Sequence, residues 1–345
     1  MPKMLQIDGG RVTNPKILSP MEVVATCRQR GQLVVQFSAR HAYNPATLQA
    51  LNEACKIAEN CLQVRFFGHD GTPFDASVLR HLPDASDVAV DCLSMIVHEE
   101  EIGLLPKLKR LRLGVFKLSR PDFLHTIDVG RLEQLSLAEN HKRNIDLSPL
   151  ARCGSLTELF IQGHSKGIEV LAALPCLRKL TLSCYAKKHP LNFIEAIPNL
   201  RELTLLLGGR ENLNDLSSTT IEMLQIVRVR GLSTLGDLSR LPSLAALSIE
   251  DQLQLLKLDL CSAKLLRLRL RNCKRLAEIS GLEAQDRLQE LFTYGVALDL
   301  NTLRDRDWPL ATRSVRLVSG NRKWNEDTKV RLAARGLGED SSGWW

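Results

Sequence analysis

Apolar residues recur along the chain in a six-residue pattern whose first, fourth and sixth positions are apolar. Clear copies are LKRLRL at 108–113, LTELFI at 156–161 and LLRLRL at 265–270. Twelve copies align, and they begin at residues 61, 85, 108, 132, 156, 177, 200, 221, 244, 265, 288 and 312. Of the 36 residues at the three apolar positions, only Thr293 and Thr312 are not apolar, which the 44% apolar background cannot produce. The chain therefore contains a repeat of 21–24 residues.

Each copy shows the alternation of a half-buried β-strand. The fourth and sixth residues lie two apart and point to one face of a strand, whereas the third, fifth and seventh point to the other. One such strand cannot bury its apolar face alone, but copies stacked side by side merge their faces into a continuous core. The pattern therefore predicts one parallel sheet with one strand per repeat.

The residues between the strands must return the chain to the start of the next strand. Five copies return through an apolar residue followed by proline: Leu82-Pro83, Leu105-Pro106, Leu174-Pro175, Ile197-Pro198 and Leu241-Pro242. Proline fixes its own φ and keeps the preceding residue extended, so the return segment ends at the same point in each of these repeats. The short period leaves room only for brief helical or 3₁₀ segments, such as 147–150 and 235–238.

These repeats resemble the short leucine-rich repeats of the internalin and phosphatase-regulator type. The copy nearest to that pattern is NIDLSPLARCGSLTEL at 144–159, and the resemblance covers about residues 61–318. It implies an α/β leucine-rich-repeat solenoid. One parallel β-sheet would form the concave face, short helical or 3₁₀ segments the convex face, and helical caps both ends.

The chain departs from that family in the turn after the strand. The family places an asparagine there, which bonds neighbouring backbone. Here it is present only as Asn140, with Cys273 a permitted substitute. Other copies carry Phe116, His164, Tyr185 or Gly208. Backbone groups in these turns then need other partners, so we expect an irregular array.

The N-terminal segment has the signals of a helical cap. Ser19-Pro20-Met21-Glu22 supplies an N-cap, a proline at N1 and a glutamate at N3, which predicts a helix to about Arg30. A strand is expected at 33–39, and Asn44-Pro45 opens a second helix through Ala58. Residues 1–60 are therefore expected to form a helical cap with one strand.

The C-terminal segment is expected to close the array. Asn325 can cap a helix to about Arg335, which Gly336 would end. We divide the remaining chain into an array of about twelve repeats at 61–320 and a cap helix with a tail at 321–345.

Composition narrows the setting. The net charge is +7, which permits an acidic partner without demanding one. No apolar stretch is long enough for a membrane helix, and the N-terminus lacks the apolar core of a secretion signal, so we expect a cytoplasmic protein. The nine cysteines form no C-x-x-C pair and are expected to be buried reduced thiols, without metal or another cofactor.

Enzyme signatures are missing from the sequence. There is no phosphate loop and no nucleophile elbow. The eight histidines form no i, i+4 pair with an acid between them, and we expect them, like the acidic run at 99–101, in solvated loops. The chain is therefore expected not to be an enzyme.

The third, fifth and seventh strand positions are the best candidate for a functional surface. Phenylalanine, tyrosine and arginine gather there, which is the composition of binding hot spots. The expected partner-binding residues are Arg65, Phe67, Arg110, Arg112, Phe160, Lys179, Glu250, Arg267, Arg269, Arg271, Glu290, Phe292, Tyr294 and Arg316.

Two functions fit this face. In the first, a monomeric chain grips a protein with an acidic surface patch, because mixed charges favour one protein partner over others. It would act as a stoichiometric inhibitor, such as an immunity protein neutralising a toxin or effector, or as an adaptor. In the second, the basic strands bind nucleic acid, which Arg267, Arg269 and Arg271 favour and the acidic residues of the same face oppose.

Overall fold

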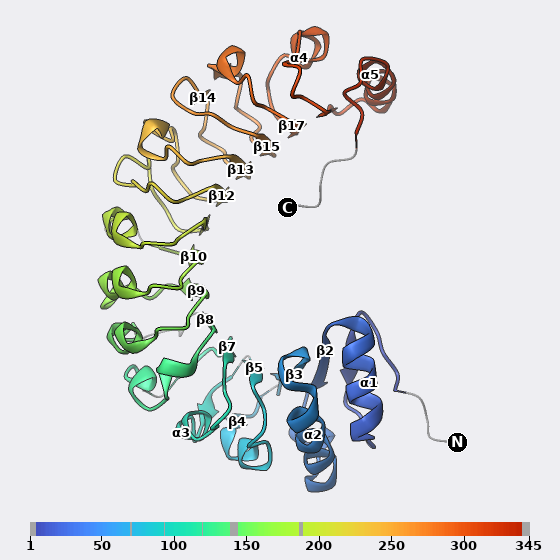
Figure 1. Cartoon of the computed structure of the whole chain (residues 1–345), viewed down its shortest axis with the longest axis vertical. Coiled ribbons are helices and arrows are strands. Elements are labelled where there is room, and N and C mark those ends of the chain that lie inside the picture. The colour runs from blue at the N-terminus through green and yellow to red at the C-terminus, as the bar shows by residue number, and fades with distance from the viewer. Residues whose placement is uncertain are drawn as a thin grey trace. The chain divides into compact units, whose positions relative to one another are not determined.

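The computed structural model describes residues 5–69, 71–92, 94–118, 120–138, 144–185 and 189–339. The chain divides into two compact units, Met1–Leu177 (unit 1) and Arg178–Trp345 (unit 2). In each unit the main strands lie along one face and the helical return segments along the opposite face (Figure 1).

The main sheet of unit 1 has the strand order β1-β2-β3-β5-β7-β8-β9. All neighbouring strands are parallel, as one strand per repeat requires. The strands are β1 (Arg11–Thr13), β2 (Leu33–Phe37), β3 (Leu62–Gly68), β5 (Asp87–Cys92), β7 (Arg110–Leu113), β8 (Gln134–Leu137) and β9 (Glu158–Gln162).

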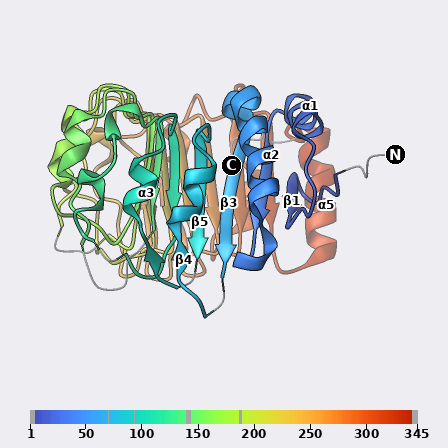
Figure 2. The same cartoon turned by 90° about the horizontal axis from the view of Figure 1, so that it is seen from below.

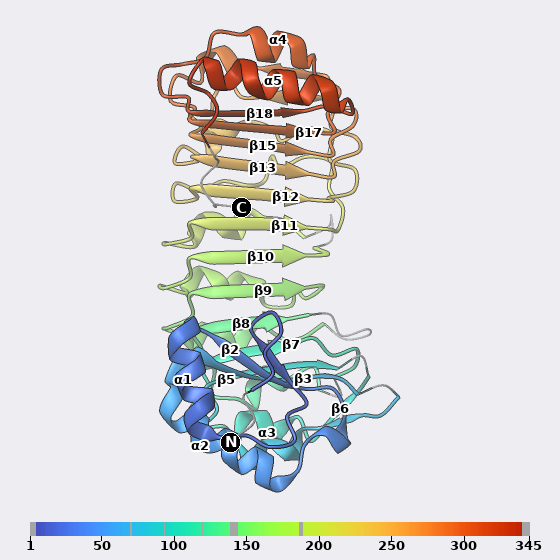
Figure 3. The same cartoon turned by 90° about the vertical axis from the view of Figure 1, so that its right-hand side faces the viewer.

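The main sheet of unit 2 has the strand order β10-β11-β12-β13-β15-β17-β18, and it is also parallel throughout. Figure 3 shows these strands as arrows with a common direction. They are β10 (Lys179–Ser183), β11 (Glu202–Leu206), β12 (Met223–Val227), β13 (Ala246–Glu250), β15 (Arg267–Arg271), β17 (Glu290–Tyr294) and β18 (Ser314–Val318).

The core of each unit consists of the apolar positions of the six-residue pattern. All of these residues except the half-buried Cys61 are buried, and so are the two threonines that interrupt the pattern. Leu135 in unit 1 and Leu203 in unit 2, at the same repeat position, are 2% and 1% exposed. The predicted merging of strand faces into a continuous core is confirmed in both units.

The return segments are short, as the repeat length predicts. Most contain a 3₁₀ turn: η3 (Ala76–His81), η4 (Phe123–His125), η5 (Val129–Arg131), η6 (Ser148–Arg152) and η7 (Ile168–Ala173) in unit 1, and η8 (Asn192–Ala196), η9 (Leu238–Arg240) and η10 (Leu282–Ala284) in unit 2. Two minor parallel pairs also lie in these segments: β4 (Phe74–Asp75) with β6 (Ile96–Val97), and β14 (Lys257–Asp259) with β16 (Glu278–Ser280).

The N-terminal cap forms as expected, with one addition. Helix α1 (Pro20–Arg30) begins at Ser19, whose hydroxyl accepts from the Glu22 amide, and α2 (Pro45–Ala58) follows η1 (Arg40–Ala42). Figure 2 shows α1 and α2 side by side, and η2 (Glu59–Cys61) follows α2. The expectation of one strand in residues 1–60 is wrong, because β1 precedes α1 and pairs with β2.

The C-terminal cap begins earlier than predicted. Helix α5 (Arg322–Ala334) is capped by Asn321, which accepts from the Trp324 amide, so the assignment of the cap to Asn325 is wrong. Asn325 instead accepts from the Ser319 amide and fixes the chain ahead of the helix. A short helix, α4 (Leu300–Asp305), was not anticipated.

The acidic run at 99–101 also differs from its expected solvated state. Glu99 and Glu101 are buried beside or within the single-turn helix α3 (Glu100–Gly103), and Glu101 accepts from Arg80. This ion pair explains how a carboxylate can be buried there. Within the described residues, no helix is long and apolar enough to cross a membrane.

Candidate functional site

The outward-facing side chains of unit 1 form a network that crosses several strands. Thr13, Gln36 and Arg65 stand in register on β1, β2 and β3. Gln36 donates through Nε2 to Thr13 Oγ1 and accepts from Arg65 Nη1, each at 2.9 Å. Arg65 Nε also donates to Asp91 Oδ2 at 2.6 Å, and its guanidinium carbon lies 4.9 Å from the centroid of the Phe67 ring. Unit 1 thus holds Arg65 through its own side chains.

A second polar group surrounds Asp87, which is only 4% exposed. Gln63 Nε2 donates to Asp87 Oδ1 at 2.8 Å, and Arg110 Nη1 lies 3.7 Å from Asp87 Oδ2. The same Arg110 nitrogen donates to the carbonyl of Asn60 at 2.9 Å. Burial raises the pKa of Asp87, although the contacts with Gln63 and Arg110 act in the opposite direction.

Two other predicted residues of unit 1 stand farther along the same face. Arg112 is exposed on β7, and Phe160 is half-buried on β9. Through Ser136 they belong to one register row, which places their backbones about 10 Å apart, two strand spacings. Of the predicted residues in this unit, Phe160 thus lies outside the networks around Arg65 and Asp87, whereas the positive charge of Arg112 acts to lower the pKa of Asp87.

Charged residues of unit 2 pair across neighbouring strands at matching positions. Lys179 Nζ lies 3.0 Å from Glu202 Oε2, Arg271 Nη1 lies 3.1 Å from Glu250 Oε1, and Arg267 Nε lies 3.2 Å from Glu290 Oε1. Glu250 and Glu290 thus each hold one arginine of β15, Arg271 and Arg267 respectively. Arg267 and Glu290 are each only 8% exposed, so this pair supports the sheet and presents little surface to a partner.

The middle arginine of β15 belongs to a different arrangement. Arg269, Phe292 and Arg316 stand in register on β15, β17 and β18, and we call them the Arg–Phe–Arg row. The guanidinium carbons of Arg269 and Arg316 lie 5.7 and 5.8 Å from the centroid of the Phe292 ring. Within the described part of the chain, no ion pair involves Arg316, which is exposed. Tyr294, on the same strand as Phe292, is 43% exposed.

The turns after the strands contain buried polar residues that the sequence did not identify as such. His164 Nδ1 accepts from the Ile145 amide at 3.1 Å, and Gln252 Nε2 donates to the Glu250 carbonyl at 2.8 Å. Cys273 Sγ lies 3.7 Å from the Ile249 carbonyl, and His69 Nδ1 lies 3.0 Å from that of Phe67.

These contacts confirm that turn backbone groups find other partners where the family's asparagine is missing; Asn140 itself lies outside the described residues. They also correct the expectation for His69 and His164, which are 2% and 1% exposed rather than solvated. Burial lowers the pKa of His164 to about 4 and raises that of Cys273 to about 11. His69, His164, Gln252 and Cys273 all lie at the ninth position of the repeat, where the family carries its asparagine. This shared position is the signal by which the sequence could have identified them as buried.

The strand ends of unit 2 have an unusual backbone. Cys184, Leu207, Arg228, Asp251 and Asn272 all have φ between 52° and 59°. Unit 1 uses glycine at the corresponding position after β9, where Gly163 has φ 77°. Since a bulky residue such as Leu207 is disfavoured in this region, the stacked repeats must impose the turn.

The cysteines and acidic groups do not assemble into a metal centre. In the ranges that the structure describes, no cluster of three or more histidine, cysteine, aspartate or glutamate side chains is placed to hold an ion. Five cysteines are buried as predicted: Cys27, Cys55, Cys92, Cys153 and Cys273. Cys176 and Cys261 are exposed and depart from that expectation.

No family model matches the chain, and no curated protein sequence matches it. Among solved structures, internalin InlF of Listeria monocytogenes aligns over 96% of this chain and 90% of its own, with a TM-score of 0.52 and 17% identity. A leucine-rich-repeat protein of Leptospira interrogans aligns over 84% of this chain and 92% of its own, with a TM-score of 0.34 and 14% identity. Leucine-rich-repeat sheets commonly serve as binding surfaces for other proteins. The likeness to the internalin and the periodic parallel strands show that this chain has the fold of a leucine-rich-repeat solenoid.

Proposed function

We propose that the chain is a non-enzymatic binding protein that grips an acidic partner protein on the outward sheet face of its repeats. The Arg–Phe–Arg row of unit 2 is the centre of this contact. The chain binds its partner stoichiometrically, either as an inhibitor that neutralises a toxin or effector or as an adaptor.

The single observation that carries the proposal is the placement of Phe292 between two arginines on neighbouring strands. Aromatic and arginine side chains together make the largest contributions to protein interfaces. Stacking on Phe292 restricts the guanidinium groups of Arg269 and Arg316 before a partner arrives, which reduces the entropy lost on binding. The exposed edge of Tyr294 adds apolar contact area beside them.

The charge of this part of the face favours an acidic partner. Strands β13 to β18 present four outward arginines, Arg267, Arg269, Arg271 and Arg316, against the two carboxylates of Glu250 and Glu290. The excess of two positive charges attracts a partner carboxylate. Guanidinium–carboxylate contacts are directional and become strong when water is excluded.

The nucleic-acid alternative receives less support. A phosphate track needs a continuous run of cations. Glu250 pairs with Arg271 and Glu290 with Arg267, so carboxylates interrupt the arginine cluster on both flanking strands.

The test is a pull-down from the source cells with the wild-type chain, performed with and without nuclease. The partner is then titrated against Arg269→Glu and against Lys329→Glu, a charge reversal of an exposed lysine on α5. We expect Arg269→Glu to weaken binding more than tenfold at an unchanged melting temperature, and Lys329→Glu to have little effect. Equal effects of the two reversals, or loss of capture after nuclease treatment, would contradict the proposal.

A further inference from the structure

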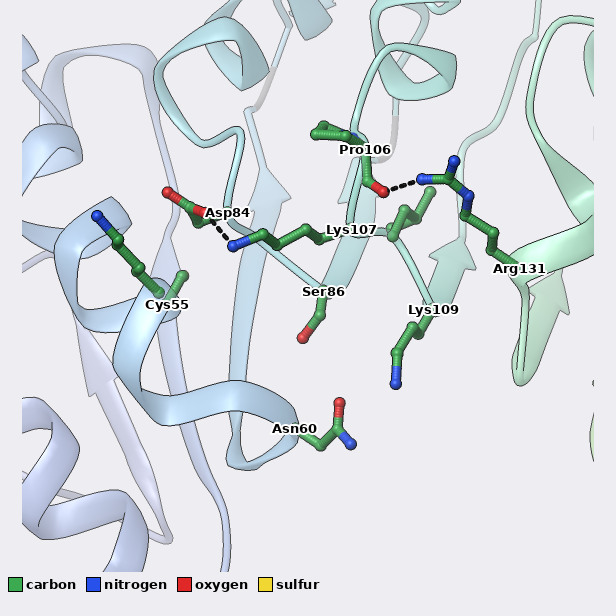
Figure 4. Close-up of a pocket in the computed structure, with 10 residues that line it drawn as sticks. Cys55, Asn60, Asp84, Ser86, Pro106, Lys107, Lys109 and Arg131 are labelled. Carbon is green, nitrogen blue, oxygen red and sulfur yellow. Dashed lines mark hydrogen bonds and ion pairs between the residues drawn. The ribbon is translucent and has the colours of Figure 1, made fainter.

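Unit 1 contains a pocket at the edge where its strands begin, away from the side chains of the sheet face. Its volume is about 520 Å³, within the range of ligand-binding cavities. It lies beside the last turn of α2 and spans the chain segments that lead into β3, β5 and β7, where Asn60, Ser86 and Lys109 line it (Figure 4). Arg131, ahead of β8, lines it as well, so the pocket crosses the entrances of four successive strands of the main sheet.

The inner surface of this pocket is apolar. Cys55 of α2 and Leu108, each only 5% exposed, are its deepest lining residues, and Pro106 lines it beside them. The aliphatic stems of Lys107 and Lys109 extend this surface, as long cationic side chains do when they keep only the charged group in water. The pocket can thus accept an apolar side chain.

The rim of this pocket is cationic. Lys56, Lys107, Lys109 and Arg131 line it, whereas Asp84 is the one carboxylate among its lining residues in the described ranges. Lys107 pairs with Asp84, and Arg131 donates to the carbonyl of Pro106 (Figure 4). Arg131 also pairs through Nε with Asp128 Oδ2 at 2.9 Å.

Several rim groups are fixed in place by their own unit. Asp84 accepts from Asn52 Nδ2 at 3.0 Å, and its amide donates to Asn52 Oδ1 at 2.9 Å. The hydrogen bond from Lys107 lowers the pKa of Asp84, which keeps that pair charged. Lys109 Nζ lies 2.9 Å from Glu133 Oε1. Lys56 is exposed on α2, and within the described residues no ion pair involves it.

We propose that this pocket is an anchor site for an acidic segment of a partner protein. An apolar side chain of that segment enters between Cys55, Pro106 and Leu108, and a flanking carboxylate meets Lys56, the rim cation that no ion pair involves within the described residues. The complementarity is twofold, apolar at the floor and positive at the rim. The site is distinct from the Arg–Phe–Arg row, so it stands or falls independently of the function proposed above.

The pocket arises from a mismatch between the cap and the repeats. Helix α2 has 14 residues, whereas the next return, η3, has six. A 14-residue α-helix is longer and wider than a six-residue 3₁₀ turn, so η3 contacts only part of α2. The last turn of α2 lies beside the strand entrances and leaves the space that Figure 4 shows.

The test uses the full chain and fluorescein-labelled peptides as probes, with binding followed by fluorescence anisotropy. The first probe has phenylalanine flanked on each side by aspartate and glutamate. The second has glycine in place of phenylalanine, and the third has lysines in place of the acids. We expect the acidic phenylalanine peptide to bind at least tenfold more tightly than either of the others.

Two variants locate this binding. Lys56→Glu reverses a rim charge, and Asn60→Trp fills the pocket from an exposed position. The matched controls are Lys16→Glu and Gln29→Trp, exposed positions of unit 1 outside the pocket. We expect at least a fivefold loss of affinity for each pocket variant and no change for the controls, with all four melting like the wild-type chain.

Three results would overturn the proposal. One is equal binding of the phenylalanine and glycine peptides. Another is loss of peptide binding in Arg269→Glu but not in Lys56→Glu, because the peptide would then occupy the sheet face. The third is a dimer in sedimentation that Asn60→Trp dissociates, which would assign the pocket to a second copy of the chain. None of these outcomes depends on the cellular partner of the Arg–Phe–Arg row.

Discussion

The two units have the same fold, but their outward side chains make different contacts. In unit 1, Arg65 contacts Gln36, Asp91 and Phe67, and Arg110 contacts Asp87 and a backbone carbonyl. In unit 2, two glutamates pair with the outer arginines of β15, while Arg269 stacks on an aromatic ring that it shares with Arg316. Residues of the same type at the same repeat positions therefore differ in what they can offer to a partner.

The difference lies in the neighbouring strands rather than in the arginines themselves. Arg65 stands opposite Ala89, a small residue that leaves a diagonal path to Asp91. Arg269 stands opposite Ser248 on one side and Phe292 on the other. The bond to Asp91 commits Arg65 to the structure, whereas the ring of Phe292 orients the guanidinium of Arg269 on the sheet face.

The two units should respond alike to a cavity in the core. This change should cause the largest loss of stability. Leu135→Ala in unit 1 and Leu203→Ala in unit 2 each empty a leucine site at the same repeat position. We expect each to lower the free energy of unfolding by about 2–5 kcal/mol. Urea denaturation of the two variants measures these losses. A loss below about 1 kcal/mol for one of them would mean that its unit relaxes around the cavity, and the packing of the two units would then differ.

The stability of the two units should depend differently on pH. The pKa of His164 in unit 1 is about 4, below its ordinary value of 6.5, because burial disfavours the charged ring. As the pH falls, the His164 ring is therefore protonated in the unfolded chain at a higher pH than in the folded chain. The contribution of neutral His164 to stability is complete above pH 6.5 and is lost as the pH falls from about 6.5 to about 4.

His164→Asn, which introduces the amide that the family carries at this position, should remove this loss. Between pH 7.5 and pH 4.5 the wild-type chain should lose about 2–3 kcal/mol more than the variant. Denaturation curves at the two pH values provide the difference. Gln252→Asn, at the same position of unit 2, is the control and should leave the pH dependence as in the wild-type chain. A wild-type pH dependence in His164→Asn would show that the acid sensitivity lies elsewhere.

The sequence predicted the repeat, the strands and most of the caps because these depend on local patterns. Ser19-Pro20 and Asn44-Pro45 identify their helix starts directly, since an N-cap and a proline at N1 act within one turn. The prediction at Asn325 was one turn late, because the segment NRKWN contains two asparagines four residues apart and the first, Asn321, is the N-cap. The strand β1 has three residues, too few for a periodic signal.

The candidate site was predictable only where register decides the contact. Glu250 stands directly opposite Arg271, and Glu290 directly opposite Arg267, so aligned repeat positions identify both pairs. The diagonal contact of Arg65 with Asp91 depends on a small residue in between and has no signature in the repeat. The pocket beside Cys55 depends on how the last turn of α2 packs beside the entrances of the strands, which only the packed structure shows.

A smaller effect is expected from the ion pair of unit 1. Asp91→Asn keeps the size of the side chain but removes the charge that faces Arg65, and both side chains are about one-fifth exposed. We expect a loss of about 1–2 kcal/mol in the free energy of unfolding, below that of a fully buried pair because of the partial exposure. Thermal and urea denaturation report it. Glu158→Gln, at an exposed position of β9, should change stability much less; a similar loss for both would argue against a structural role for the Arg65–Asp91 contact.

The smallest effect on stability should come from the corresponding change in unit 2. Glu250→Gln removes the partner of Arg271, whose side chain is 43% exposed. Because exposed pairs contribute little, the free energy of unfolding should change by less than about 0.5 kcal/mol.

The same variant should bind the acidic partner faster than the wild-type chain does. The variant raises the charge excess of β13 to β18 by one and leaves Arg271 available to a partner carboxylate. Association with the acidic partner isolated in the pull-down should therefore accelerate by roughly two- to fivefold at low salt, and the gain should vanish as salt screens it. Stopped-flow measurements at two salt concentrations, beside Glu283→Gln on the exposed η10 turn as the control, decide the question. If Glu250→Gln destabilises unit 2 as much as Asp91→Asn destabilises unit 1, or slows association, the glutamates of unit 2 are structural and the contrast between the two faces is lost.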